Sequence, residues 1–381
     1  MEPFSPEGNL HPPAVDLWTY ILSSTNEYEN EVSAVLDRFS GRIKGLANVQ
    51  DSNGRAAIHI ANRVYKNTIM KRLYLFQRYD LFEGPPEHKS ATCILYRAKD
   101  YGDGRRRVAL KFMSNEDHFN RELQARLSLN LDPKFVVTVL ISHIGDNMLH
   151  TTEEMMSERL YSYCIVMPAA ERSLRTIIDH EHIAGREWER IKVMTRELAE
   201  ALLHIHSLGV IHGDVKPNNI MRCDGRIKLI DLDASVDIGK KCTAIKYSSA
   251  YIPPEMITRN PYQLPNTTLN ASLVFDMQES IGCRALAHLS QSTVDGMEVL
   301  VRAGNDRSDI EETDINDLPY ELVTATPSFD MWSFGVTLYN LCTGEPLFLA
   351  NDEDNIDQDQ LQLLLEWNNA IKAAKLSKIS H

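Results

Sequence analysis

The sequence lacks the features that mark exported, membrane-spanning or nucleic-acid-binding proteins. No stretch approaches the ~18 consecutive apolar residues of a membrane span. The first residues, MEPFSPEGNLHPP, hold no basic region followed by an apolar run, so they do not form a secretory signal. Basic residues are in deficit, since 40 Lys and Arg face 53 Asp and Glu and the net charge is −13. We therefore expect neither nucleic acid nor a membrane as a partner, because both attract basic surfaces.

Cysteine is scarce and scattered, with six residues in 381. None of them forms a C-x-x-C pair, which argues against a zinc knuckle or a disulfide framework. Free thiols fit a reducing compartment. We expect a cytoplasmic protein, with the nucleus as the alternative.

The chain contains enough apolar material for a large core, because 43% of its residues are hydrophobic. Its length suits one large two-lobed domain plus an appendage. Residues 1–13 are polar and rich in proline, which predicts a disordered tail. Residues 14–76 are predicted to form a helical extension. Its first apolar residues recur at helical spacing: Leu17, Tyr20, Ile21, Val32, Val35, Leu36 and Phe39.

Residues 78–170 change to the spacing of β-strands, which predicts a small antiparallel lobe. The expected strands cover 78–82, 92–96, 107–112, 135–144 and 161–167, with a helix over 116–129. The turn Tyr101-Gly-Asp-Gly104 supplies residues that tolerate positive φ, as a tight hairpin requires.

Residues 171–381 are predicted to form a mainly helical lobe, so the fold class is α+β. Apolar residues from Trp188 to Ile205 repeat at helical spacing, and Gly209 ends that run as a C-terminal cap. Further helices are expected over 330–343 and roughly 358–379. Polar and acidic residues over about 260–318 are interpreted as an insertion.

One short segment, Ile211-His-Gly-Asp-Val-Lys-Pro-Asn-Asn-Ile220, carries the groups that phosphoryl transfer needs. Asp214 can accept a hydroxyl proton, and Lys216 can neutralise a γ-phosphate. Asn219 can hold a metal through its amide oxygen. Asp231 follows after a short hairpin, so its carboxylate can return beside Asn219 to bind Mg²⁺.

This segment resembles the H-R-D-x-K-P-x-N catalytic loop of eukaryotic-type serine/threonine protein kinases, and Asp231 resembles the magnesium Asp of D-F-G. The resemblance implies a two-lobed fold, ATP and Mg²⁺ as cofactors, and a protein substrate. A lysine at position 216 favours Ser/Thr over Tyr substrates. In this motif His212 packs and hydrogen-bonds the loop rather than moving protons.

The small lobe carries further motifs of the same family. Val108-Ala-Leu-Lys111 resembles the V-A-I-K strand, which implies that Lys111 holds the α- and β-phosphates of ATP. Glu122 is the expected helical ion-pair partner of this lysine. Glu116 is the alternative, although it lies only five residues after the lysine. Gly84 is what remains of the glycine-rich loop, since Pro85 and Pro86 follow it.

Three more segments arrive in the order of the family. Cys164-Ile-Val-Met-Pro-Ala-Ala170 resembles the hinge, with Met167 as gatekeeper and with adenine contacts from Pro168 and Ala170. Tyr251-Ile-Pro-Pro-Glu255 resembles A-P-E, and Asp330 would cap the next helix and brace the catalytic loop. The resemblance covers about residues 78–350, and ordered motifs are more specific than any one alone.

The sequence also departs from the family. D-F-G reads Asp-Leu-Asp, so Asp233 stands where a glycine is usual, and H-R-D reads His-Gly-Asp. The missing arginine normally receives a phosphorylated activation loop. We therefore hypothesise that activity does not depend on phosphorylation at Thr243, Ser248 or Ser249. No arginine follows Asp330, whereas the family pairs a late arginine with the Glu of A-P-E, so we expect either that the chain is truncated or that Glu255 has another partner.

Residues 51–61 resemble the first turn and helix of an ankyrin repeat. This suggests an ankyrin-repeat-associated kinase whose N-terminal segment binds a protein partner; the alternative is a helical extension with a chance match. The leading functional hypothesis is an active ATP-dependent serine/threonine kinase. A pseudokinase scaffold and an ankyrin-type adaptor are the competing hypotheses.

Overall fold

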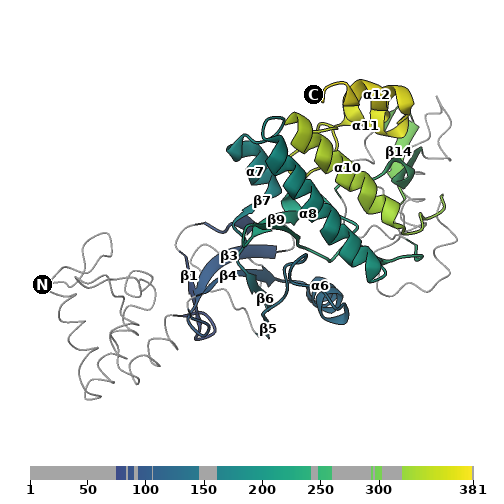
Figure 1. Ribbon diagram of the computed structural model, residues 1–381. Helices are drawn as coiled ribbons and strands as arrows, with labels where there is room; N and C mark the ends of the chain where they lie inside the picture. Colours follow the sequence, from purple (N-terminus) through teal and green to yellow (C-terminus); the bar gives the residue numbers. More distant parts are fainter. Residues whose placement is uncertain are drawn as a thin grey trace, which may run out of the picture. The chain divides into compact units, whose positions relative to one another are not determined.

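The computed structural model describes residues 74–82, 85–89, 93–104, 106–145, 161–241, 248–259, 293–294, 297–302 and 320–379 (Figure 1). The predicted tail and nearly all of the predicted N-terminal extension lie outside these residues. The described residues fall into two compact units. The first unit holds those up to Phe119 and those within Val139–Ala169, and the second holds the remainder.

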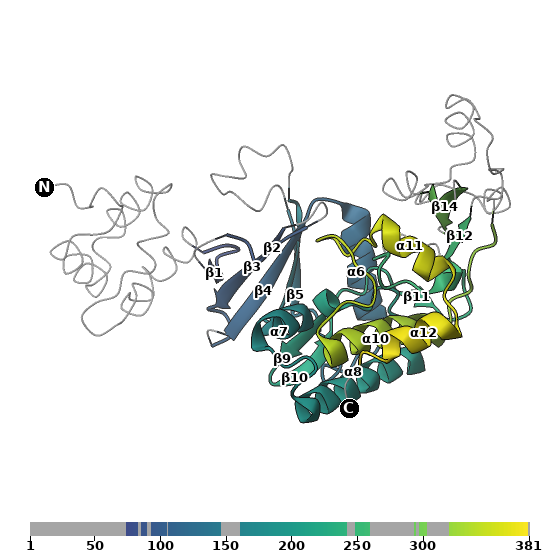
Figure 2. The same ribbon diagram turned by 90° about the horizontal axis from the view of Figure 1, so that it is seen from above.

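The first unit is built on one antiparallel sheet in the order β1-β3-β4-β6-β5, with β2 paired to β3 (Figure 2). Its strands are β1 (Tyr79–Leu81), β2 (His88–Lys89), β3 (Cys93–Asp100), β4 (Arg106–Met113), β5 (Ile141–Ile144) and β6 (Tyr163–Pro168). The predicted antiparallel sheet is therefore confirmed. The strand expected to start at residue 135 starts at Ile141 instead, because Val136 and Val137 pair with Leu229 of the second unit's own hairpin.

The core of this sheet is apolar, and an ion pair closes its end. Ile94, Leu110 and Phe112 are fully buried. At the start of β1, Arg78 donates two hydrogen bonds to the Asp100 carboxylate, at 2.6 and 2.7 Å. Burial of Asp100 would raise its pKa, but the hydrogen bonds from Arg78 and the Gly102 amide outweigh burial and hold the pKa below its ordinary value.

The second unit is mainly helical. Its helices are α7 (Leu174–Glu181), α8 (Trp188–Ser207), α10 (Pro327–Thr343), α11 (Gln358–Leu365) and α12 (Asn369–Leu376). Helix α6 (Glu116–Ser128) spans the division between the units. Short strands complete the second unit: β7 (Arg172–Ser173), β8 (Val210–Ile211), β9 (Ile220–Cys223), β10 (Arg226–Leu229), β11 (Val236–Asp237), β12 (Ile257–Arg259), β13 (Thr293–Val294) and β14 (Met297–Val301).

Helix α8 is the centre of one core of this unit. Its buried stripe includes Ile191, Leu198 and Leu202. The helix packs on the β9–β10 hairpin and on α10 (Figure 1). The helix ends at Ser207, and Gly209 takes a φ of 84° beyond it, where its amide donates to the His206 carbonyl. A glycine tolerates this left-handed conformation without steric cost.

Two sequence predictions about the helices are wrong. The helix expected over roughly 358–379 is broken in two, because the Asn368 side chain accepts hydrogen bonds from the Ala370 and Ile371 amides and starts α12 anew. Helix α10 is capped by Thr326 rather than by Asp330, which lies in its first turn. Of the predicted insertion, only residues 293–294 and 297–302 are described, and they form a small sheet with β12.

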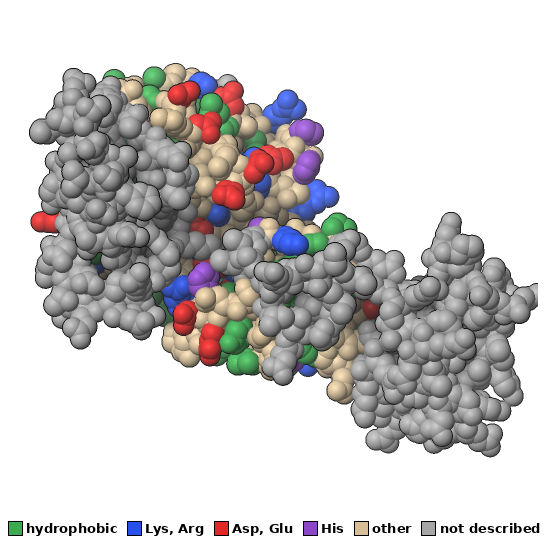
Figure 3. Space-filling model, turned by 180° about the vertical axis from the view of Figure 1, so that it is seen from behind, with side chains coloured by type: hydrophobic (Ala, Val, Ile, Leu, Met, Phe, Trp, Pro, Cys, Tyr) green, Lys and Arg blue, Asp and Glu red, His purple; other side chains and the backbone are tan. Residues whose placement is uncertain are grey.

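No described helix combines the length and the apolar character that crossing a bilayer requires. On the face seen in Figure 3, acidic, basic and hydrophobic side chains are interspersed rather than gathered into one patch.

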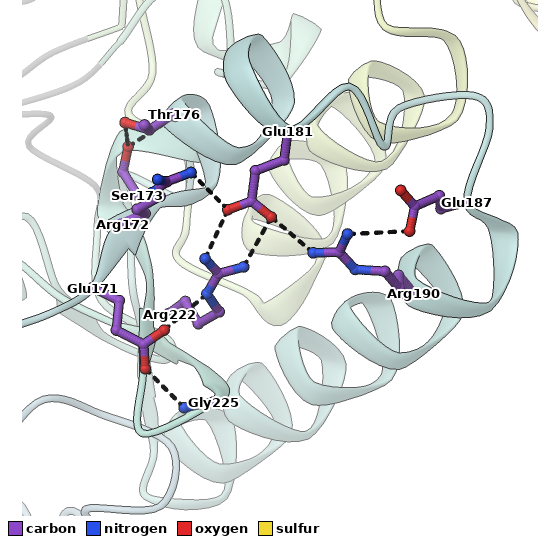
Figure 4. A network of polar contacts seen from close by, with 9 residues as sticks. All are labelled: Glu171, Arg172, Ser173, Thr176, Glu181, Glu187, Arg190, Arg222 and Gly225. Carbon is purple, nitrogen blue, oxygen red and sulfur yellow. Dashed lines mark hydrogen bonds and ion pairs between the residues drawn. The ribbon is translucent and has the colours of Figure 1, made fainter.

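An ionic network connects strand β9 with helices α7 and α8 (Figure 4). Arg222 of β9 donates to both oxygens of Glu181 at 2.7 and 3.1 Å, and Arg190 of α8 donates to the same carboxylate at 2.7 Å. Arg222 also reaches Glu171 at 3.0 Å, and Arg172 reaches Glu181 at 3.1 Å. Hydrogen bonding by Arg222 and Arg190 outweighs desolvation and lowers the pKa of Glu181 to about 2.

This depressed pKa predicts how stability depends on pH. The stabilisation by Glu181 is complete above its ordinary pKa of 4.5 and is lost as pH falls toward about 2. We expect Glu181→Gln to cost about 1 kcal/mol at pH 7, since two of the three arginines, Arg172 and Arg190, are about half exposed, and to flatten the acid limb of stability below pH 4.5. Denaturant titrations across pH measure this. Glu189→Gln, which removes an exposed pair with Lys192, is the control, and an equal change in both variants would contradict the network.

Candidate active site

The segment from Ile211 to Ile220 leaves β8, passes through one 3₁₀ turn over Pro217–Asn219 and enters β9. Gly213 has a φ of 81°, a conformation that side chains rarely adopt. A Cβ at this position would also overlap the Ala234 carbonyl. The departure from H-R-D therefore has a physical reason, because this path of the loop admits only glycine at position 213.

The carboxylate of Asp330 holds the start of the loop. It is fully buried and accepts hydrogen bonds from the His212 amide at 2.7 Å and from the Gly213 amide at 3.0 Å. The His206 ring adds a third contact at 2.8 Å. Asp330 lies on α10, so this helix and α8 together fix the two amides that precede Asp214.

Both nitrogens of the buried His212 ring are engaged. The Asp214 amide donates to Nδ1 at 3.3 Å, so Nδ1 is an acceptor, and Nε2 then donates to the Ile230 carbonyl at 2.9 Å. These partners assign the neutral ring with its proton on Nε2. With neither nitrogen available, the ring holds Asp214 and the segment before Asp231 together.

Asp214 is 3% exposed and has two carboxylate oxygens in different states. Asn219 donates from Nδ2 to the Asp214 carbonyl and to its Oδ2, each at 2.8 Å. The other oxygen, Oδ1, is buried and has no hydrogen-bond partner among the described residues. A buried acceptor without a donor costs about 1–3 kcal/mol, so a donor group that reached this oxygen would be bound favourably.

Lys216 lies at the centre of a cluster of oxygens. Its Nζ is 3.7 Å from Asp214 Oδ2 and 3.3 Å from Asp354 Oδ2, and it donates to Ser248 Oγ at 2.5 Å. Asn218 also donates to Asp354 Oδ2, at 3.2 Å. Sequence reasoning missed both Ser248 and Asp354 as site residues. Asp354 belongs to an acidic run, but local sequence does not show that it returns to a loop 138 residues earlier.

Asn219 and Asp231 are neighbours, as the hairpin spacing predicts. The Ile230 amide donates to the Asn219 carbonyl at 3.0 Å, and Asp231 follows with a φ of 63°. Because Nδ2 of Asn219 is bound by Asp214, its amide oxygen is directed away from that residue. An amide and a carboxylate oxygen are donors that Mg²⁺ accepts, so the pair fits this ion. Among the described residues, no group of three His, Cys, Asp or Glu side chains could hold a metal.

Lys111 lies in the first unit, on the central strand β4, in register with Leu95 and Ile165. It is 8% exposed. Glu122 lies in the second unit, is fully buried and pairs with Arg126 one helical turn later at 3.1 Å. Arg126 also donates to the Val137 carbonyl. The ion pair between Lys111 and Glu122 stays a prediction. The alternative, Glu116, is exposed and bonds the Tyr163 hydroxyl.

Met167 is buried on β6, opposite Ala109, and Pro168 ends that strand. The next amide, of Ala169, donates to the Arg107 carbonyl at 3.2 Å and is therefore used within the sheet. The adenine contacts of the Pro168 carbonyl and the Ala170 amide stay predictions. Gly84 lies outside the described residues.

The structure shows the surroundings of two segments that depart from the family pattern. Glu255 lies in a 3₁₀ turn and is exposed, and no ion pair involves it within the described ranges. In the Asp-Leu-Asp segment, Leu232 is buried, and Asp231 rather than Asp233 takes the left-handed conformation. Asp233 therefore adopts no conformation that requires the usual glycine.

The comparisons with known proteins agree with this geometry. Residues 95–268 match the family model of the protein kinase domain. The chain is 33% identical to rhodopsin kinase grk7-b of Danio rerio over 104 residues, which cover 26% of this chain and 19% of that protein. It is 26% identical to homeodomain-interacting protein kinase 1 of Mus musculus over 161 residues, 41% of this chain and 13% of that protein. It is 29% identical to serine/threonine-protein kinase ArnS of Sulfolobus acidocaldarius over 172 residues, 39% of this chain and 27% of that protein.

The conformation of Gly213 generates a prediction with a matched control. Gly213→Ala combines left-handed strain with overlap on the Ala234 carbonyl, so we expect about 3 kcal/mol or more of destabilisation and loss of activity. Gly225→Ala has similar strain, with a φ of 73°, but an open surrounding, and should cost only about 1–2 kcal/mol. Thermal and denaturant unfolding compare the two. Equal costs would show that the close approach to Ala234 is unimportant.

Proposed function

We propose that this chain, of which residues 95–268 match the family model of the protein kinase domain, is an active ATP-dependent protein kinase that transfers the γ-phosphoryl group to Ser or Thr hydroxyls of proteins. The chain spans between 13 and 27% of the three relatives described above, so the activity of the whole protein is part of this proposal. One of these relatives is named a protein kinase and another a serine/threonine-protein kinase, which supports the reaction class.

The observation that carries the proposal is the state of Asp214. One oxygen is fixed by Asn219, and the other is buried without a donor. A substrate hydroxyl is a donor of the right size, and Asp214 can orient it and accept its proton as the phosphoryl group transfers. A scaffold without catalysis gains nothing from this orphaned acceptor, so the pseudokinase alternative is not favoured.

The neighbouring residues supply the rest of the chemistry. Lys216 is positioned to offset the charge of the transferring phosphoryl group while it holds the Asp214 side chain. Asn219 and Asp231 would hold Mg²⁺, which would offset the negative charge of the phosphates. Lys111, by its place in the V-A-L-K strand, would neutralise the α- and β-phosphates. Ser248, which accepts from Lys216, places the segment after the activation loop against the same cation.

The finer identity of the protein is also part of the proposal. A lysine at position 216 favours Ser/Thr substrates over Tyr. We infer that residues 14–76 form a helical extension related to an ankyrin repeat and bind a protein partner, on the resemblance of residues 51–61. The acidic balance and the scattered thiols favour the cytoplasm.

Removal of the Asp214 carboxylate tests the proposed function. We expect Asp214→Asn to lower kcat about 10²–10⁴-fold with little change in ATP affinity, because the base is lost while the predicted nucleotide contacts remain. Transfer from labelled Mg·ATP to a generic protein, and nucleotide binding, measure the two effects. Asp224→Asn changes an exposed carboxylate on the same lobe and should leave both unchanged. Equal losses of turnover and ATP binding in Asp214→Asn would contradict the assigned role.

A second prediction concerns activation. Ser248 and Ser249 are buried, and Ser249 Oγ accepts from the Ile356 amide at 2.8 Å, so neither hydroxyl is presented to another kinase. Thr243 lies outside the described residues. We expect activity to stay within twofold after treatment with a broad-specificity phosphatase and in Thr243→Ala. Inactivation by the phosphatase would show that the loop depends on phosphorylation.

Ser248→Ala should lower activity, because it removes the hydrogen bond from Lys216, while Ser248→Thr keeps a hydroxyl that can accept this bond.

A further inference from the structure

One residue of the second unit combines a buried charge with a backbone conformation that side chains rarely adopt. Asp354 lies in the segment between α10 and α11, is 7% exposed and has a φ of 62°. Glycine takes this left-handed conformation without steric cost, and Asn and Asp tolerate it better than other residues. Because glycine would relieve the strain, the fold alone does not account for a carboxylate at this position, and strained residues of this kind gather at functional sites.

The segment that carries Asp354 is held by contacts that do not involve its carboxylate. The side chain of Asn351 accepts hydrogen bonds from the amides of Glu353 and Asn355, each at 3.0 Å. The Asp354 amide donates to the Asn351 carbonyl at 3.0 Å, and the Asp354 carbonyl accepts from the Ala250 amide at 3.2 Å. A residue without a carboxylate can therefore take the same place in the chain.

The carboxylate of Asp354 is directed at the catalytic loop. Its Oδ2 accepts a hydrogen bond from Asn218 at 3.2 Å and lies 3.3 Å from Lys216 Nζ. Lys216 is largely buried, so water and salt screen this ion pair less than a surface pair. The same ammonium lies 3.7 Å from Asp214 Oδ2 and donates to Ser248 Oγ at 2.5 Å. Lys216 is therefore shared between two carboxylates, and the nearer one is not the predicted base.

This sharing sets how strongly Lys216 pairs with Asp214. Their separation of 3.7 Å is longer than the roughly 2.7–2.9 Å of a hydrogen bond between an ammonium and a carboxylate. Without the attraction of Asp354, we expect the ammonium to close on Asp214. A carboxylate in a close ion pair is a weaker proton acceptor, because the pair stabilises its charged form. The ammonium would also be less available to a transferring phosphoryl group.

We propose that Asp354 is a positioning residue for phosphoryl transfer. It holds Lys216 away from full pairing with Asp214, which leaves Asp214 able to accept the proton of the substrate hydroxyl. It also keeps the charge of Lys216 available to the phosphoryl group. This inference rests on the proposed kinase function and adds to it a residue outside the catalytic loop.

Two substitutions remove the charge and suit the backbone. Asp354→Gly takes the left-handed conformation without strain, and Asp354→Asn tolerates it and keeps an oxygen for Asn218. We expect kcat to fall about 10–100-fold in Asp354→Gly and by a smaller factor in Asp354→Asn, with the KM for ATP within about twofold of wild type. Thermal unfolding shows whether the variants are folded. A kcat equal to or above that of the wild type in both folded variants would overturn the proposal.

Asp224 supplies a matched control in the same unit. It is also left-handed, with a φ of 52°, but its carboxylate is exposed on the β9–β10 turn and pairs with Lys228 at 3.6 Å. Asp224→Gly and Asp224→Asn make the same chemical changes in the same backbone conformation, so kcat should stay within about twofold of wild type. Equal losses of kcat in Asp224→Gly and Asp354→Gly would trace the effect to the backbone and contradict the assigned role.

A double-mutant cycle separates an action through Lys216 from a purely structural role. Lys216→Met removes the ammonium and should lower kcat by itself. If Asp354 acts through Lys216, adding Asp354→Gly to Lys216→Met should change kcat by less than about twofold, although the same change alone has a large effect. A loss of the same size in both backgrounds would show that Asp354 acts by another route and would overturn the proposal.

Crystal structures of the wild-type chain and of Asp354→Gly test the positioning without turnover. We expect the distance from Lys216 Nζ to Asp214 Oδ2 to shorten from 3.7 Å to about 2.8 Å once the second carboxylate is gone. If it shortens but the wild-type chain transfers no phosphate, Asp354 positions Lys216 and the kinase function fails. If it stays unchanged, the positioning role is wrong whatever the activity, and a wild-type chain that transfers phosphate keeps its kinase function.

Discussion

The active-site loop depends on one buried negative charge, the carboxylate of Asp330. A buried carboxylate is costly unless donors surround it, and here two backbone amides of the loop and a histidine ring do so. The same contacts satisfy amides that would otherwise be buried without acceptors. Helix α10 and the loop are thus coupled. If they separated, the Asp330 carboxylate would lose its donors and the two loop amides would lose their acceptor. The positions of His212 and Asp214 follow from this coupling.

Charge compensation continues from there through Lys216. This one ammonium group contacts a carboxylate in its own loop, a hydroxyl at Ser248 and a carboxylate at Asp354. Three segments far apart in sequence therefore meet at a single cation. Such a cluster favours one arrangement of the three, because moving any segment removes an ion pair or a hydrogen bond of Lys216. The segment between α10 and α11 is held in this way against the catalytic loop.

The sequence predicted the sheet of the first unit and the neighbourhood of Asp214 and Asn219, because local spacing encodes both. It did not predict the contact of Asp354 with Lys216, since a pairing across 138 residues leaves no periodic pattern and an acidic run is usually a solvated surface. The end of α11 was also missed, although Asn368 is a residue type typical of helix starts. Asp330 was expected to cap α10, but the two loop amides and His206 surround its carboxylate.

The long distance in sequence between Asp330 and the loop that it holds also affects when, during folding, the active site can form. The bonds from Asp330 reach back 117 and 118 residues to Gly213 and His212. Contacts of such long range form late, because closing a long loop costs entropy before the contact rewards it. During synthesis, a ribosome must translate helix α10 before the segment made more than a hundred residues earlier can take its final shape. Incomplete chains thus carry every catalytic residue and still lack the assembled site.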